Sequence, residues 1–388
     1  MHERSRGRVT RGGSTWAQQT MASNLLLTSL LVGSTPVKPP GSIVMFVADD
    51  LGWNDLMFRN SRMRTPVIEG LRQKGVTLTS YYVQPVCSPT RGSLLSGKFP
   101  LNLGFDSVIH DTEPMGVPLD AVLLPQALQA HGFATHLLGK WHIGMFKPAL
   151  LPINRGFSSA FGYLCGSTGY WDHGNTEAFC PGHPEPVFVL DLTNGTRPAI
   201  GEFGGRWNGT YETEMYSAAL EEILDSRANL TQPLFLYIAP NNVHTPLGAP
   251  DIYYEGFENE LNEGRRTFMA TAAAMDAFVE NVTGSLARHG LMEDATFVFT
   301  TDNGGNLRGS GNNWPLRAGK FTTWEGGGET KTPTTYGLLF GLLSMRFLTR
   351  FRRQMGREYC GRTTTSYSLV SLGTGKKLVV PGAAGETP

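Results

Sequence analysis

The chain has 388 residues, of which 40% are hydrophobic and 17% charged, so it is a globular protein long enough for one large domain or two ordinary ones. Its 33 basic residues balance its 33 acidic residues, and this zero net charge gives no support for nucleic-acid binding. The 47 glycines and 24 prolines indicate many turns and long functional loops.

Residues 1–35 have the pattern of a secretory signal region with an extended front. Arginines precede a short apolar run, residues 25–32, and small polar residues follow it. The run is too short to span a bilayer, and Met21 is an alternative start. Potential N-glycosylation triplets begin at Asn194, Asn208, Asn229 and Asn281. We therefore expect a glycoprotein of the secretory pathway, lysosomal or extracellular, without a stable membrane span.

Four apolar stretches predict strands that are buried on both faces of a mostly parallel sheet. They cover residues 42–47, 134–138, 234–238 and 295–300. Helical patterns cover residues 65–74, 119–131 and 267–289. A further short helix is predicted to begin at Cys87, because Pro89 suits a first helical turn and Gly97 can end the helix. The pattern predicts an α/β fold.

Polar residues follow each predicted strand directly. They are Asp49 and Asp50, Lys140 and His142, His244, and finally Asp302 and Asn303. Because open α/β sheets bind ligands at the carboxyl ends of their strands, we expect these side chains to reach one crevice.

The two acidic pairs supply hard oxygen ligands. Asp49 with Asp50, and Asp302 with Asn303, suit Ca²⁺ or Mg²⁺ better than zinc or copper. The alternative for either pair alone is helix capping, which is common for Asp and Asn after a strand. Two such pairs at two strand ends favour a metal site.

Cys87 and Arg91 lie four residues apart near the start of a predicted helix, so they face the same way at an end that attracts anions. A thiolate is a soft ligand and a poor partner for a hard ion. One interpretation of Cys87 is a buried structural cysteine. The other is that its sulfur is replaced by oxygen after synthesis, because an aldehyde hydrate would be both a hard ligand and a nucleophile.

Four further candidates are basic residues. Lys140 and His142 would point to one face if strand geometry continued through them, where they could neutralise an anion and move a proton. The alternative is a surface lysine and a core histidine. His244 precedes a turn signal, and Lys320 lies in a glycine-rich loop, where a lysine is usually only solvated.

The cysteines are few: Cys87, Cys165, Cys180 and Cys360. In an oxidising compartment Cys165 and Cys180 could close a short loop through a disulfide bond. Cys87 would then remain free for chemistry.

Two motifs resemble the signatures of the type I, formylglycine-dependent sulfatases of the alkaline-phosphatase-like superfamily. Residues 87–91, Cys-Ser-Pro-Thr-Arg, with Leu-Leu-Ser-Gly at 94–97, resemble the modification signature, and residues 139–142, Gly-Lys-Trp-His, resemble the second signature. The likeness runs over residues 42–327. Residues 311–317 and 324–327 look most like the arylsulfatase B group, whose members cleave 4-sulfate from N-acetylgalactosamine in dermatan and chondroitin sulfate.

The resemblance implies a mixed, mostly parallel sheet flanked by helices, within a catalytic domain at residues 36–327. It implies that a formylglycine-generating enzyme converts Cys87 to formylglycine, whose hydrate attacks sulfur. The implied Ca²⁺ ligands are Asp49, Asp50, Asp302, Asn303 and the modified Cys87.

The remaining implied roles concern the sulfate group. Arg91 would hold the hydrate and the charge beside the ion. Lys140, His244 and Lys320 would grip the sulfate oxygens, with His244 or Lys320 protonating the departing alcohol. His142 would take a proton from the second hydroxyl, which expels inorganic sulfate and restores the aldehyde. Cations that gather where a sulfuryl group spreads its charge would stabilise the transition state.

The sequence departs from the family after Gly327. Family members continue with an apolar strand and later a smaller C-terminal domain, whereas residues 328–388 are unrelated. We expect a divergent, disordered tail without strand pattern, a missing C-terminal subdomain, and a sheet edge left exposed by the missing strand.

The expected activity is that of a sulfuric ester hydrolase, an arylsulfatase acting on glycosaminoglycan-type or aryl sulfates. The first alternative, motivated by the tail, is an inactive truncated sulfatase that binds sulfated glycans. The second is a phosphomonoesterase or phosphodiesterase of the same superfamily; these use Ser or Thr as nucleophile, so Cys87 argues against it.

Overall fold

The computed structural model describes residues 41–78, 81–178, 187–199, 206–227, 231–327 and 339–341. All of them belong to one compact unit, Pro40–Pro388. The predicted signal region, Asn229, Cys180 and the tail, apart from residues 339–341, lie outside the described residues. Over this described part of the chain, no helix has both the length and the hydrophobicity needed to cross a membrane.

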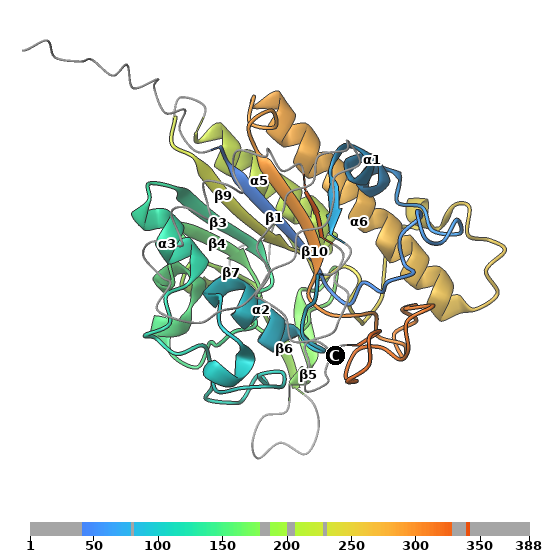
Figure 1. The fold of residues 1–388 in the computed structure, drawn as a ribbon, viewed down its shortest axis with the longest axis horizontal. Coiled ribbons are helices and arrows are strands. Elements are labelled where there is room, and N and C mark those ends of the chain that lie inside the picture. Colours follow the sequence, from blue (N-terminus) through green and yellow to red (C-terminus); the bar gives the residue numbers. More distant parts are fainter. Residues whose placement is uncertain are drawn as a thin grey trace, which may run out of the picture. The chain divides into compact units, whose positions relative to one another are not determined.

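A nine-stranded sheet forms the centre of this unit (Figure 1), in the order β2-β11-β10-β1-β9-β3-β4-β7-β8. Its strands are β1 Ile43–Ala48, β2 Val76–Leu78, β3 Ala134–Gly139, β4 Ser159–Gly162, β7 Thr193–Asn194, β8 Arg197–Pro198, β9 Leu234–Ala239, β10 Thr296–Thr301 and β11 Leu339–Gly341. The five strands from β10 to β4 in this order pair in parallel, and the outer pairings are antiparallel. A separate antiparallel ribbon joins β5 Gly174–Ala178 to β6 Val187–Leu190.

Helices lie over both faces of the sheet. The α-helices are α1 Pro66–Lys74, α2 Cys87–Ser96, α3 Leu124–Ala130, α5 Glu212–Asp225 and α6 Glu263–Arg288, and short 3-10 turns cover Pro100–Asn102, Pro148–Leu150, Pro152–Asn154 and Asp251–Tyr254. Figure 1 shows α2 and α3 over one face and α5 and α6 over the other. The mixed, mostly parallel α/β sheet flanked by helices is therefore confirmed.

Strand alternation builds a separate core on each face. In β9, Leu236 and Ile238 pack toward α5 and α6, whereas Phe235 and Tyr237 pack in the cluster that includes α2 and α3. All six residues of β9 are buried, as expected for a central parallel strand covered on both sides. This double burial explains why the strands could be predicted from continuous apolar runs.

The bounds of two helices follow from nearby residues, and one of the predicted bounds is corrected. The helix predicted over residues 119–131 begins only at Leu124, because Pro125 fits the first turn of a helix and not its interior. α2 begins at Cys87 and ends at Ser96, followed by Gly97 with a left-handed φ of 67°, as predicted.

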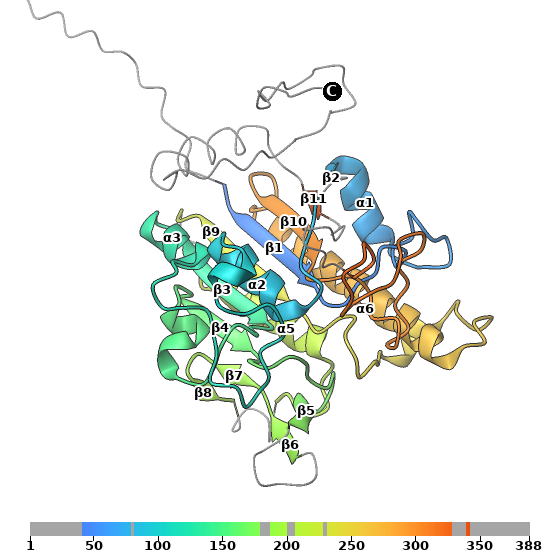
Figure 2. The same cartoon turned by 60° about the horizontal axis from the view of Figure 1, so that its bottom comes forward.

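The expectation of a tail without a strand is wrong at β11. Leu339–Gly341 lies between β10 and β2 and pairs antiparallel with both (Figure 2). β10 is therefore paired on that side at Val298 and Phe299, and it is not the edge strand of the sheet. β11 lies within an apolar run of the sequence, residues 336–345.

Candidate functional site

The carboxyl ends of the central strands carry the site. Asp49 and Asp50 follow β1, Lys140 follows β3, His244 comes from the loop after β9, and Asp302 follows β10. Asp50 adopts a left-handed φ of 58°, an uncommon conformation for a residue other than glycine. Strained backbone of this kind is concentrated at functional sites.

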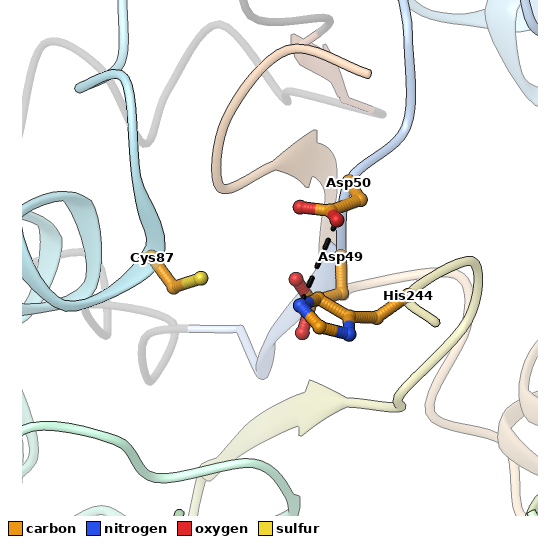
Figure 3. Close-up of side chains that lie close together, drawn as sticks. All are labelled: Asp49, Asp50, Cys87 and His244. Carbon is orange, nitrogen blue, oxygen red and sulfur yellow. Dashed lines mark ion pairs between the residues drawn. The ribbon is translucent and has the colours of Figure 1, made fainter. Parts of the chain in front are cut away.

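Cys87 faces these strand ends from the first turn of α2. Figure 3 shows its sulfur directed toward Asp49, Asp50 and His244. Ligand atoms of these four residues all lie within 4.8 Å of one another. The Cys87 side chain is buried, and burial raises the pKa of its thiol, although Lys140 and Lys320 oppose the shift. An unmodified Cys87 is therefore a neutral thiol, a weak nucleophile and a weak ligand for a hard ion.

Buried cations pair with the carboxylates. Arg91 donates from Nε and a terminal nitrogen to Asp302 Oδ2, at 3.0 and 2.7 Å. Lys140 Nζ donates to Asp49 Oδ2 at 2.6 Å, and Lys320 Nζ lies 2.6 Å from Asp50 Oδ1. Burial alone would raise the pKa of Asp49, but Lys140 and other nearby positive charges hold it below its usual value. The same balance, with Lys320 as the main cation, lowers the pKa of Asp50.

Three oxygens in this cluster have no hydrogen-bond partner within the described residues. They are Asp49 Oδ1, Asp50 Oδ2 and Asn303 Oδ1, and all three are buried. Asn303 is held beside Asp50 by a 2.6 Å hydrogen bond from its Nδ2 to Asp50 Oδ1. Buried polar atoms without partners are rare and require an explanation. A hard divalent cation with oxygen ligands fits these residues.

His244 and Lys320 form a pair beside the acidic cluster, and His244 is the more exposed of the two. His244 Nδ1 lies 2.6 Å from the Thr245 carbonyl, which fixes the proton on Nδ1 and leaves Nε2 to accept from Lys320 Nζ at 3.0 Å. His244 Nε2 is also 3.6 Å from Asp50 Oδ2. Burial and the Lys320 charge lower the pKa of His244, so its imidazole is neutral at pH 7. The sequence motifs placed His244 beside the sulfate group. They did not indicate that it also lies among the candidate metal ligands Asp49, Asp50 and Cys87.

His142 is buried, with one ring nitrogen free. Its Nε2 donates to the Ile109 carbonyl at 3.0 Å, whereas Nδ1 has no partner within the described residues. Burial, together with the charges of Lys140 and Arg91, holds the pKa of His142 well below its usual value. Nδ1 thus has a lone pair that can accept a proton.

The expected strand geometry from Lys140 to His142 is absent. β3 ends at Gly139, whose φ is 105°, and His142 adopts a left-handed φ of 55°. A side chain at Gly139 would meet the Ala239 carbonyl oxygen at 2.0 Å, so glycine permits the close approach of β3 to β9. Lys140 and His142 reach the site through this turn and not along one face of a strand.

A buried network behind β9 holds the His244 loop, and the sequence carried no signal for it. The Asn241 N–H donates to Glu212 Oε1 at 2.7 Å, and the Tyr163 hydroxyl donates to Asn241 Oδ1 at 3.1 Å. The Tyr170 hydroxyl lies 3.2 Å from the Asn241 carbonyl and 3.0 Å from the His244 carbonyl. Glu212 stands at the start of α5, where an acidic residue ordinarily indicates only a favourable helix dipole.

Glu212 is predicted to make the protein less stable as pH rises. Burial raises its pKa from 4.5 to about 8, with the Asn241 hydrogen bond opposing and the Asp49 charge adding to the shift. The folded state therefore keeps a proton that the unfolded chain loses above pH 4.5, so stability falls between pH 4.5 and about 8. From pH 5 to 7.5 we expect a loss on the order of 3 kcal/mol in the free energy of unfolding.

Glu212→Gln should remove this component of the pH dependence, because glutamine keeps the acceptor for Asn241 and does not titrate. Urea unfolding at both pH values measures it. Glu214→Gln, at an exposed position of the same helix, is the matched control. Its free energy of unfolding should depend on pH as that of the protein without substitutions does. Equal pH slopes for all three proteins would contradict the prediction.

The accessory predictions have mixed outcomes. Cys165 is buried as a free thiol, with its sulfur 3.7 Å from Met145 Sδ, and its expected partner Cys180 lies outside the described residues. Asn194, Asn208 and Asn281 are exposed, as glycan attachment requires. Disulfide formation and glycosylation stay predictions.

Known proteins are similar to the part of the chain that carries these strands and the site residues. The family model for sulfatases matches residues 42–332. Arylsulfatase J of Mus musculus is 38% identical over 289 residues, which cover 74% of this chain and 46% of the relative. Arylsulfatase A of Homo sapiens is 30% identical over 326 residues, covering 79% of this chain and 61% of the relative.

A solved structure shares the fold. The crystal structure of Ps i-CgsB in complex with k-i-k-neocarrahexaose aligns with a TM-score of 0.67 at 30% identity, over 78% of this chain and 65% of that one. The chain thus spans between 46% and 65% of the lengths of these three proteins. The matched family region contains every strand end and loop that carries a site residue, and we conclude that this chain belongs to the sulfatase family.

Proposed function

We propose that the protein hydrolyses sulfate esters at the site around Cys87. The observation that supports this most strongly is the meeting of Cys87 with Asp49, Asp50 and His244 beside three buried cations, Arg91, Lys140 and Lys320. A neutral buried thiol is a weak nucleophile, whereas the family's conversion of this cysteine by a formylglycine-generating enzyme would supply an aldehyde hydrate that can attack sulfur.

Residues of the protein would bind the sulfate group and transfer the protons. Arg91 and Lys140 hold charge beside Cys87, and Lys320 and His244 are close enough together to bind the same sulfate group. In this proposal the departing alcohol oxygen is protonated by Lys320, or by His244 Nε2 after Lys320 has passed it a proton. His142 accepts a proton at Nδ1, because its Nε2 is committed to the Ile109 carbonyl.

Calcium is the cofactor that this donor set suits. Asp49, Asp50, Asp302 and Asn303, with the modified Cys87, would hold it, and when bound it supplies Lewis-acid polarisation of a sulfate oxygen. Three buried carboxylates already balance three buried cations, so a divalent ion would leave the site with an excess of positive charge. That excess suits an anionic ester.

The proposed substrates are sulfated sugars of glycosaminoglycan type, with N-acetylgalactosamine 4-sulfate as the first to test. Ps i-CgsB, which is similar in fold, was crystallised with k-i-k-neocarrahexaose, and this supports a sugar substrate class. We assign catalysis to a domain of residues 36–327 and expect the protein in the secretory pathway, lysosomal or extracellular, because of its signal pattern and its exposed Asn-x-Thr sites.

Activity on paired aryl esters tests the proposal. Protein produced together with a formylglycine-generating enzyme should release sulfate from 4-nitrophenyl sulfate at least about 100-fold faster than it releases phosphate from 4-nitrophenyl phosphate. Preference for the phosphate ester would indicate a phosphatase. Binding of a sulfated glycan without any turnover, in protein whose Cys87 peptide has the aldehyde mass, would indicate a non-catalytic binding protein.

A further inference from the structure

One exposed aromatic side chain stands beside the buried site. Phe321 follows Lys320 directly, and 63% of its surface is exposed. Its ring centroid lies 5.1 Å from Lys320 Nζ, the atom that contacts both Asp50 and His244. The Phe321 N–H donates to the Pro85 carbonyl at 3.2 Å, two residues before Cys87. Phe321 therefore bridges the Lys320 loop and the approach to Cys87.

The backbone that presents this ring is strained and firmly held. Phe321 adopts a left-handed φ of 71°, which is an outlier for a bulky residue. The loop is fixed by Asn313, which is buried and accepts from the Gly305 N–H at 2.8 Å while donating to the Ala318 carbonyl at 3.1 Å. The Lys320 N–H also donates to the Gly305 carbonyl at 3.2 Å. Strain that keeps an apolar ring in solvent needs a functional reason.

Other exposed apolar side chains in this loop do not share these contacts. Leu307, Trp314 and Trp324 are 55%, 70% and 45% exposed, and Trp324 stacks under Arg317, whose guanidinium carbon lies 3.6 Å from the ring centroid. Phe321 is adjacent in sequence to the lysine of the site and hydrogen-bonded to the segment that precedes Cys87. This position distinguishes it from its neighbours.

We propose that Phe321 is a specificity-determining residue that stacks on the ring of the substrate, a pyranose or an aryl group, while the sulfate binds among the cations around Cys87. This inference rests on the proposed sulfatase activity. Asp49, Arg91 and Lys140 are fully buried, and in this proposal they receive only the compact sulfate group. The organic part must stay outside, where Phe321 offers an apolar face next to Lys320. Sugar and aryl rings both present such a face.

The test separates ring-bearing from ringless esters. With 4-nitrophenyl sulfate, Phe321→Ala should raise KM about three- to tenfold with little change in kcat, and Phe321→Tyr should restore the original KM. Ethyl sulfate, which has no ring, should show the same kcat/KM with all three proteins. Phe99→Ala, which removes another exposed phenylalanine outside the site, is the matched control and should leave both substrates unaffected.

The outcomes are distinct from those that test the activity itself. Absence of turnover in the protein without substitutions, produced with the formylglycine-generating enzyme, would overturn the sulfatase proposal. Normal turnover with an unchanged KM in Phe321→Ala would overturn only the stacking role. Equal losses on 4-nitrophenyl sulfate and ethyl sulfate would also overturn it, because they would indicate that Phe321 merely supports Lys320.

Discussion

Replacing Cys87 with alanine is expected to abolish sulfate release, with kcat/KM lower by a factor on the order of 10⁴ or more. The variant removes the Cys87 sulfur, which lies within 4.8 Å of ligand atoms of Asp49, Asp50 and His244. None of the neighbouring groups can replace it, because the carboxylates are paired with cations and His244 is held by Lys320 and Thr245. Turnover of 4-nitrophenyl sulfate measures the effect.

Cys165→Ala is the matched control, because Cys165 is the other free buried thiol among the described residues and lies outside the cluster. It should retain full turnover. Mass spectrometry of the Cys87 peptide then relates activity to the modification: the active protein should have the aldehyde mass and unconverted protein the thiol mass. Sulfate release by Cys87→Ala, or by protein with an intact Cys87 thiol, would contradict the mechanism.

The elements that carry this site could be predicted because their signals are local. β1, β3, β9 and β10 are buried on both faces and read as continuous apolar runs, each followed by polar residues. The start of α2 is likewise set by nearby residues, Pro89 and Gly97. In a parallel sheet such strand ends meet at one edge, so residues far apart in sequence could be placed together from topology alone.

What the sequence did not reveal depends on tertiary contacts. Glu212 is unusual only because Asn241 and the packing of α5 against the sheet bury it, and no pattern around residue 212 indicates this. The turn at Gly139, which redirects His142, exists because β3 approaches β9 closely. β11 was not predicted because its three residues are too few to show the alternation of apolar and polar side chains that marks a strand. It is recognised as a strand only by its pairing with β10 and β2.

Calcium should stabilise the folded protein, and the effect should depend on Asp50. At a calcium concentration 100 times the dissociation constant, the free energy of unfolding should rise by about 2.7 kcal/mol, because the ion binds the folded state alone. The physical origin is a set of buried oxygens that have no hydrogen-bond partner among the described residues, Asp49 Oδ1, Asp50 Oδ2 and Asn303 Oδ1. Thermal unfolding in calcium and in a chelator measures the difference, and re-addition of calcium should restore both stability and turnover.

Asp50→Asn keeps the shape of the side chain but removes its negative charge and one of its two oxygens, and it should abolish most of the calcium-dependent stabilisation. A second described cluster, Glu221, Asp225 and His289, provides the control, because its ligand atoms also lie within 4.8 Å of one another. Glu221 already pairs with Arg288 and Ser285, and Asp225 with His289, so their charges are compensated without an ion. Glu221→Gln should therefore leave the calcium effect unchanged. If Glu221→Gln abolished the effect and Asp50→Asn did not, calcium would bind at the surface cluster, and the oxygens beside Cys87 would need another explanation.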